Sequence, residues 1–206
     1  MKKICLLILV LGLVLLYSQA YSVEIVADAT GYDAGYVTDF WGVKFISGSG
    51  YIQSVTFDLS TTGGYFDFDG SPFLIPLIPG VEPVLGVMNG LSSSDITYPT
   101  NGGNPVGTPT VLTFTFSTGS FTEGDWFRFS ADVDGRGRAG GDFGSIGTLF
   151  EVTMSDGNIY SVPFMTINTN SSEANIETDS VPEPSTFMLL IGGLAGVGLL
   201  RRRFKN

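Results

Sequence analysis

The chain has 206 residues, a formal net charge of −10, 28 Gly, 16 Phe, one Cys and no His. Its charged fraction of only 15% and its aromatic content of 13% exclude intrinsic disorder, which needs many charges and few aromatic residues. The lack of His removes the commonest general base and zinc ligand, and the single Cys excludes an internal disulfide.

The basic residues are concentrated at the two ends of the chain. The span 21–180 holds 19 of the 20 Asp and Glu but only four of the ten Lys and Arg, namely Lys44, Arg128, Arg136 and Arg138. A surface this acidic excludes nucleic acid as a partner, because phosphate binding depends on Lys and Arg. It suits an exported soluble domain, or a domain that collects divalent cations.

Residues 1–20 have the three parts of a secretory signal peptide. Two lysines form a positive start, an apolar run of thirteen residues follows, and small residues precede the end. The pattern predicts cleavage by signal peptidase between Ala20 and Tyr21. Cleavage would also remove Cys5, so we expect a mature chain without cysteine.

The span 21–167 has the alternation that is typical of half-buried antiparallel strands. Apolar and polar residues alternate over 55–60, 112–116, 127–133 and 150–154. The sequence Ser155-Asp156-Gly157-Asn158 predicts a hairpin turn. We therefore expect a mainly β fold, with a single antiparallel β-sandwich of jelly-roll type over residues 21–167.

Two Asp-x-Asp-Gly segments are the strongest candidates for a metal site within this domain. Their acids, with one more after a Gly-rich loop, are Asp67, Asp69, Asp132, Asp134 and Asp142. Carboxylates at short spacing on loops suit calcium, and the two segments could share an ion if the loops meet. The second segment lacks the glutamate that ends an EF-hand loop. The alternative is that the Asp-Gly pairs form turns and the nearby arginines pair with the acids.

Residue types for catalysis are scarce. A Ser-His-Asp triad and a thiol nucleophile are impossible in the mature chain, so we expect no enzymatic activity. A secreted glycan hydrolase that uses carboxylates alone is the alternative, with Asp132, Asp134, Asp142 or Glu151 as its acids. The Gly-x-Gly-x-x-Gly pattern at 135–140 opens no helix, which excludes a dinucleotide fingerprint.

Aromatic side chains that face outward can stack on sugar rings. The candidates are Trp41, Trp126 and Tyr160. Trp126 lies on the opposite face of its predicted strand from Phe127 and Phe129, which predicts an outward position. The alternative for each candidate is burial against the second sheet or a loop.

Residues 168–180 are polar, lack aromatics and contain one aliphatic residue, Ile176. This composition predicts a solvated linker between the domain and the C-terminal tail.

The tail, residues 181–206, has three parts. Pro182-Glu183-Pro184 is followed by an apolar segment over 187–200 and by the cluster Arg201-Arg202-Arg203. As a helix the apolar segment would extend about 21 Å, which makes a short transmembrane helix in a hydrocarbon core of about 30 Å. The arginines would stay cytoplasmic by the positive-inside rule, with the domain on the other side of the membrane.

This tail resembles the PEP-CTERM sorting signal of exported bacterial proteins. The resemblance implies recognition by an exosortase, an integral membrane cysteine transpeptidase, which would cut near the Pro-Glu-Pro triplet. The inner membrane would then be a transient anchor, and the released domain would reach the cell surface or extracellular matrix. Because the family is associated with exopolysaccharide and biofilm, we expect a structural or adhesive role. The alternative is a calcium-dependent carbohydrate-binding adhesin.

Overall fold

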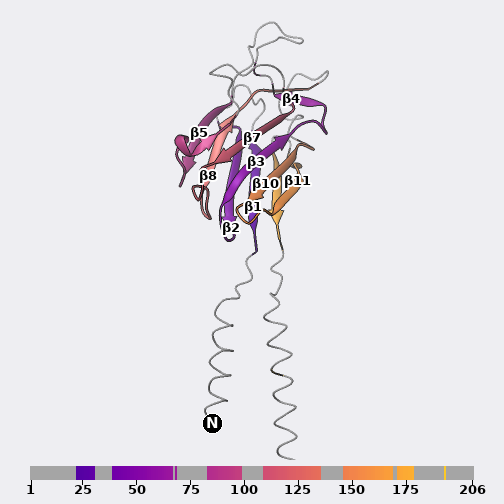
Figure 1. Ribbon diagram of the computed structural model, residues 1–206. Helices are drawn as coiled ribbons and strands as arrows, with labels where there is room; N and C mark the ends of the chain where they lie inside the picture. The colour runs from indigo at the N-terminus through magenta and orange to yellow at the C-terminus, as the bar shows by residue number, and fades with distance from the viewer. Residues whose placement is uncertain are drawn as a thin grey trace, which may run out of the picture. The chain divides into compact units, whose positions relative to one another are not determined.

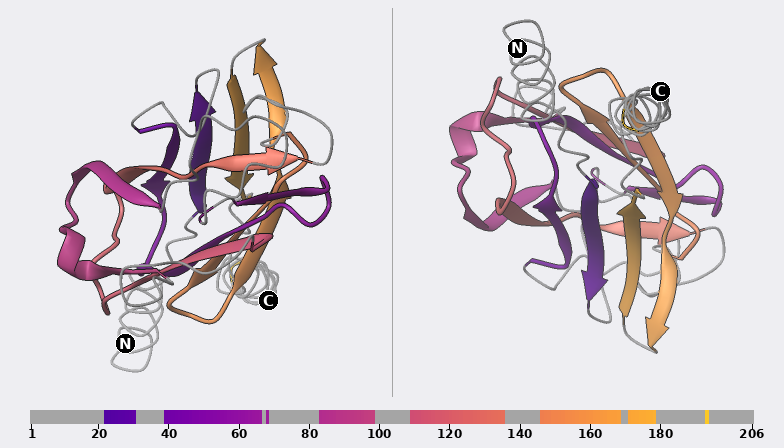
Figure 2. Two further views of the ribbon diagram at one scale, coloured as in Figure 1. Left: turned by 90° about the horizontal axis from the view of Figure 1, so that it is seen from above. Right: turned by 90° about the horizontal axis from the view of Figure 1, so that it is seen from below.

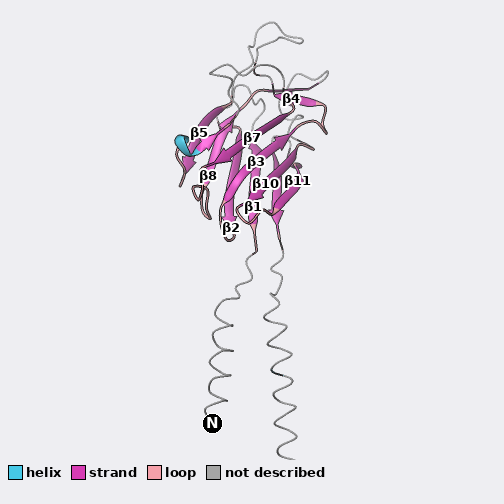
Figure 3. Ribbon diagram, in the orientation of Figure 1, coloured by secondary structure: helices cyan, strands magenta, loops and turns pink. Residues whose placement is uncertain are grey.

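The computed structural model describes residues 22–30, 39–66, 68, 83–98, 109–135, 146–168, 171–178 and 193. The strands belong to one compact unit, Val23–Thr178, and the residues outside it group separately. The described part of this unit consists of strands, loops and one short 3₁₀ turn, η1 (Ser93–Asp95) (Figure 3). The predicted mainly β fold is therefore confirmed.

Two antiparallel sheets form the two layers of the unit (Figure 1), and Figure 2 shows them from above and from below. The larger sheet has six strands in the order β12-β13-β1-β2-β8-β5. Their bounds are β1 (Glu24–Thr30), β2 (Trp41–Ser47), β5 (Val84–Asn89), β8 (Trp126–Ser130), β12 (Met165–Asn168) and β13 (Ser171–Glu177).

The smaller sheet has five strands in the order β11-β10-β3-β7-β6. Their bounds are β3 (Ile52–Asp58), β6 (Ile96–Thr97), β7 (Val111–Phe116), β10 (Leu149–Met154) and β11 (Ile159–Pro163). A separate ladder pairs β4 (Gly64–Phe66) with β9 (Val133–Gly135). The two antiparallel sheets confirm the coarser prediction of a mainly β fold in two layers, and the finer prediction of a jelly-roll-like arrangement stays a prediction.

The alternating segments contain strands β3, β7, β8 and β10, but β8 ends at Ser130, so the predicted segment 127–133 is interrupted before β9. In β10 the side chains alternate between half-buried and buried along the whole strand. The predicted turn at 155–158 joins β10 to β11 as a hairpin, with the Met154 N–H donating to the Asn158 carbonyl at 2.9 Å. Gly157 has a φ of 85°, a value that glycine adopts without a Cβ clash. Local alternation and turn chemistry therefore agree here.

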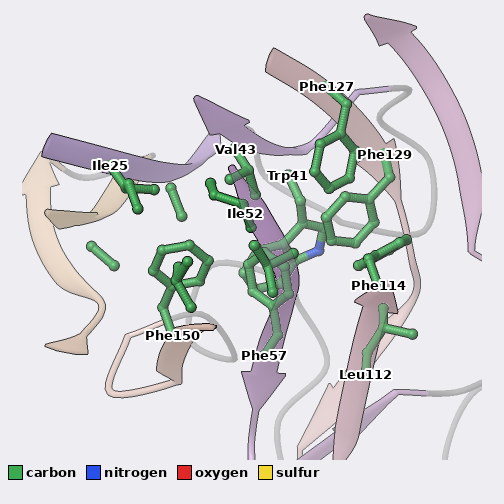
Figure 4. Close-up of a cluster of buried hydrophobic side chains, with 14 of the residues drawn as sticks. Ile25, Trp41, Val43, Ile52, Phe57, Leu112, Phe114, Phe127, Phe129 and Phe150 are labelled. Atoms are coloured by element: carbon green, nitrogen blue, oxygen red, sulfur yellow. The ribbon is translucent and has the colours of Figure 1, made fainter. Parts of the chain in front are cut away.

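Aromatic rings fill the space between the two sheets (Figure 4). Trp41 of β2 is fully buried and lies nearly parallel to Phe129 of β8, with ring centroids 6.1 Å apart. Phe57 of β3 meets the Trp41 ring edge-to-face at 5.2 Å, and Phe164 meets it at 5.5 Å. Such pairs contribute about 0.5–1.5 kcal/mol each beyond the area that they bury. Trp41 therefore joins both sheets into one core.

The predicted linker contains a core strand. Residues 171–177 form β13, which pairs with β1 over seven residues and also with β12. Ala174 is fully buried and Ile176 is 3% exposed, so this segment has a core face despite its polar composition. The prediction of a solvated spacer over 168–180 is wrong for this segment, because Ala174 and Ile176 alternate inward while the polar residues between them point outward.

A matched pair of lysine substitutions distinguishes a strand from a linker at this position. Ala174→Lys places an ammonium group in the core, and we expect it to lower the free energy of unfolding by about 3 kcal/mol. Asn175→Lys adds the same charge on the exposed face, where a change within about 0.5 kcal/mol is expected. Urea unfolding measures both, and equal small changes would restore the linker interpretation.

Candidate functional site

The pairing of β2 with β8 divides their side chains between the core and the outer surface. The register sets Trp41 opposite Phe129 and Val43 opposite Phe127, and all four side chains are buried. Side chains alternate along a strand, so the residues between them face away from the core. These outward residues are Gly42, Lys44, Trp126 and Arg128. The outward position predicted for Trp126 is thus what the structure has, and the ring is partly exposed.

An ion pair crosses this outer face from β8 to β1. Arg128 Nη2 donates to Asp28 Oδ2 at 2.6 Å, and Nη1 donates to Oδ1 at 3.2 Å. Arg128 Nε donates to the Asp39 carbonyl at 2.8 Å, so the guanidinium is held from two sides. The two side chains are 27% and 31% exposed, and solvent screening limits the stabilisation by such a pair to about 1 kcal/mol or less. Its main effect is to fix the orientation of the guanidinium.

Gly42 provides the space for this ion pair. It lies on β2 between β1 and β8, opposite Asp28 on one side and Arg128 on the other. A Cβ at this position would lie 2.5 Å from Asp28 Oδ1 and 2.8 Å from Arg128 Nη1. Both distances are shorter than van der Waals contact, so any side chain here would displace the pair.

A shallow groove of about 280 Å³ lies over these strands, and we call it the β2–β8 groove. Asp28, Gly42, Lys44, Trp126 and Arg128 are among its lining residues. Lys44 is exposed, and its ammonium group makes no hydrogen bond or ion pair within the described part of the chain. Among the described residues that line the groove, Asp28 balances Arg128, and Lys44 adds one uncompensated positive charge. An indole, a fixed guanidinium–carboxylate pair and a free ammonium group therefore line one hollow.

The three aromatic candidates do not come together. Trp41 is fully buried in the core, so the prediction that it stacks on a sugar ring is wrong. Tyr160 is half-buried on β11 and belongs to the other sheet. Trp126 lines the groove, and the residues that accompany it there, Asp28 and Lys44, were not singled out as a site from the sequence. The signal that could have found Lys44 is the scarcity of cations in the domain.

The acidic candidates for calcium are placed in part. Asp132 is buried, at 9% exposed, and Asp134 belongs to β9, while Asp67, Asp69 and Asp142 lie outside the described residues. The β4–β9 ladder pairs Phe66 with Val133, so the chain beside the first Asp-x-Asp-Gly segment runs next to the second. Over the ranges that the structure describes, no three Asp, Glu, Cys or His side chains gather as a metal site. Calcium binding stays a prediction.

The predicted signal peptide and transmembrane helix fall outside the described residues, apart from Gly193. No helix among the residues that are described is long and apolar enough to cross a membrane. The C-terminal tail is therefore characterised by its sequence.

Residues 180–203 match the family model of the PEP-CTERM protein-sorting motif. This match confirms the resemblance that the triplet Pro182-Glu183-Pro184, the apolar segment and the arginine cluster indicated. A PEP-CTERM motif implies an exported protein that is anchored in the membrane by its tail and recognised by an exosortase. The matched residues follow the compact unit Val23–Thr178, so the match identifies the tail and says nothing about the domain. No curated protein and no solved structure matches the chain.

Calcium in the Asp-x-Asp-Gly region is tested by thermal unfolding. If Asp132 is a ligand, the midpoint rises in millimolar calcium relative to chelator, because calcium at a hundredfold excess over its Kd stabilises by about 2.7 kcal/mol. Asp132→Asn should remove most of this rise. A wild-type midpoint that is the same in calcium and in chelator would contradict the calcium hypothesis.

Proposed function

We propose that the chain is a non-catalytic protein of the cell envelope or extracellular matrix, with a structural or adhesive role in exopolysaccharide. In this proposal a signal peptidase removes residues 1–20, and an exosortase-type transpeptidase cuts near the Pro182-Glu183-Pro184 triplet. The PEP-CTERM match supports the second step. The lack of His, and the position of the single Cys within the signal peptide, support a binding role over a catalytic one.

The pairing of β1 with β13 supports the proposal that the domain is released intact. The first and last strands, β1 and β13, are paired, with Glu24 opposite Glu177. The Val23 N–H donates to Thr178 Oγ1 at 2.9 Å, and the Thr178 N–H donates to the Val23 carbonyl at 3.0 Å. Both proposed cuts lie outside this pair of strands, so processing at either end would remove none of the strands that the structure describes. The domain is therefore built to remain folded after release.

The bonds between Val23 and Thr178 also limit how far from the folded domain the transpeptidase would cut. Residues 179–181 separate Thr178, the last residue described in the sandwich, from Pro182. Four residues of extended chain reach at most about 14 Å. A cut at the triplet would therefore occur within about 14 Å of the folded domain, and the released protein would keep only a short C-terminal extension.

The adhesive part of the proposal rests on the β2–β8 groove. A partly exposed indole beside fixed polar groups suits a sugar ring, whose C–H face is apolar and whose edge carries hydroxyl groups. The groove lies on the outer face of the six-stranded sheet, where it stays available when the core is closed.

Intact mass spectrometry of the protein from the extracellular matrix fraction of its native cells tests the proposal. We expect a chain that starts at Tyr21 and ends near the triplet, with or without an added group at its new C-terminus. The membrane fraction of the same cells serves as the control for unprocessed chain. Recovery of a chain that runs to Asn206, in the membrane fraction alone, would contradict processing and release.

A further inference from the structure

The groove contains two of the few positively charged residues of this domain. Only four Lys and Arg occur between residues 21 and 180, against 19 Asp and Glu. Two of the four, Lys44 and Arg128, line the same groove on neighbouring strands. Trp126 lies directly across from Lys44 in the β2–β8 ladder and two residues from Arg128 on its own strand. The cations therefore flank the one tryptophan that faces outward.

Arg128 already pairs with Asp28, so Lys44 is the charged group that a ligand can use. A guanidinium has five N–H donors, and Arg128 uses one on the Asp39 carbonyl and two on the Asp28 carboxylate. Two donors remain, and Asp28 neutralises the charge. The Lys44 ammonium keeps three donors and a full charge in solvent. A ligand that brings one negative charge next to Lys44 would make the groove electrically neutral.

We propose that the β2–β8 groove binds an acidic saccharide of the uronic acid type. The sugar ring lies on the Trp126 indole, and its carboxylate pairs with the Lys44 ammonium. The ring hydroxyl groups bind the fixed pair, donating to Asp28 and accepting from the two remaining N–H groups of Arg128. This inference rests on the proposed adhesive function and names the class of polysaccharide that the groove would select.

The acidic character of the domain limits this interaction to short range. Most of the 19 Asp and Glu repel a polyanion, but at physiological ionic strength such repulsion is screened beyond about 8 Å. The attraction between Lys44 and a carboxylate in contact with it is screened less than the repulsion from distant Asp and Glu side chains. We therefore expect single acidic residues within a mixed polysaccharide to bind better than a fully charged polymer.

Calorimetric titration of the protein purified from its producing cells tests the inference. The probes are a trisaccharide with one galacturonic acid residue between two galactose residues and its carboxyl-reduced counterpart, which keeps the same rings and linkages without the charge. We expect the acid to bind about fivefold more tightly, as one exposed charge pair implies. Lys44→Gln should remove this preference by weakening the binding of the acidic trisaccharide about fivefold.

Two further variants separate stacking from charge. Trp126→Ala should weaken the binding of both sugars by about tenfold or more, as expected for an aromatic anchor. Ile159→Ala removes an exposed apolar side chain, 61% exposed, from the other sheet and should leave both affinities unchanged. Thermal melts verify that each variant is folded, and if Trp126→Ala is not, Lys44→Gln carries the test alone.

The possible failures are distinguishable. Equal affinity of the wild type for both trisaccharides would overturn the acidic class and leave the adhesive function standing. Binding of neither trisaccharide would overturn the inference. In that case the exopolysaccharide of the native cells, used as the probe, decides the proposed function, which falls if that polymer is not bound either.

Discussion

The rest of the structure depends on the register between β2 and β8. This register places Trp41 against Phe129 in the core, where the tryptophan also meets Phe57 of the opposite sheet. Because side chains alternate along a strand, the same register places Trp126 and Lys44 together on the outer face. A slip of one residue would exchange the two faces, so the core and the groove are consequences of one pairing.

The aromatic core makes that register strongly preferred. Trp41 is fully buried, and truncation of a buried aromatic residue typically costs about 3–5 kcal/mol. Its indole Nε1 is a buried polar atom without a hydrogen-bond partner in the described part of the chain. The surrounding rings, Phe40 and Phe164 among them, pack against the indole at centroid distances of 5.4 and 5.5 Å.

The sequence predicted those parts of the fold whose signal is local. Alternation identified β7 and β10, and Asp156-Gly157 identified a hairpin turn. It failed at β13, because the inward residues Ala174 and Ile176 are few and the intervening polar residues dominate the composition. It also failed for Trp41, although Val43 and Phe45 follow at spacing two and place it on the same face of β2. The groove was beyond sequence reasoning because Asp28 and Arg128 are 100 residues apart and meet only through strand order.

A disulfide cross-link between β2 and β8 tests the shared register most directly. The Phe45 N–H donates to the Asp125 carbonyl, so the next pair, Lys44 and Trp126, is a non-hydrogen-bonded pair with Cα atoms about 4.5 Å apart. That separation permits a disulfide. In a chain that starts at Tyr21 and has no other cysteine, Lys44→Cys with Trp126→Cys should oxidise, whereas Lys44→Cys with Asp125→Cys should stay reduced. Oxidation of the second variant and not the first would mean a register shifted by one residue, and would contradict this account of the core and groove.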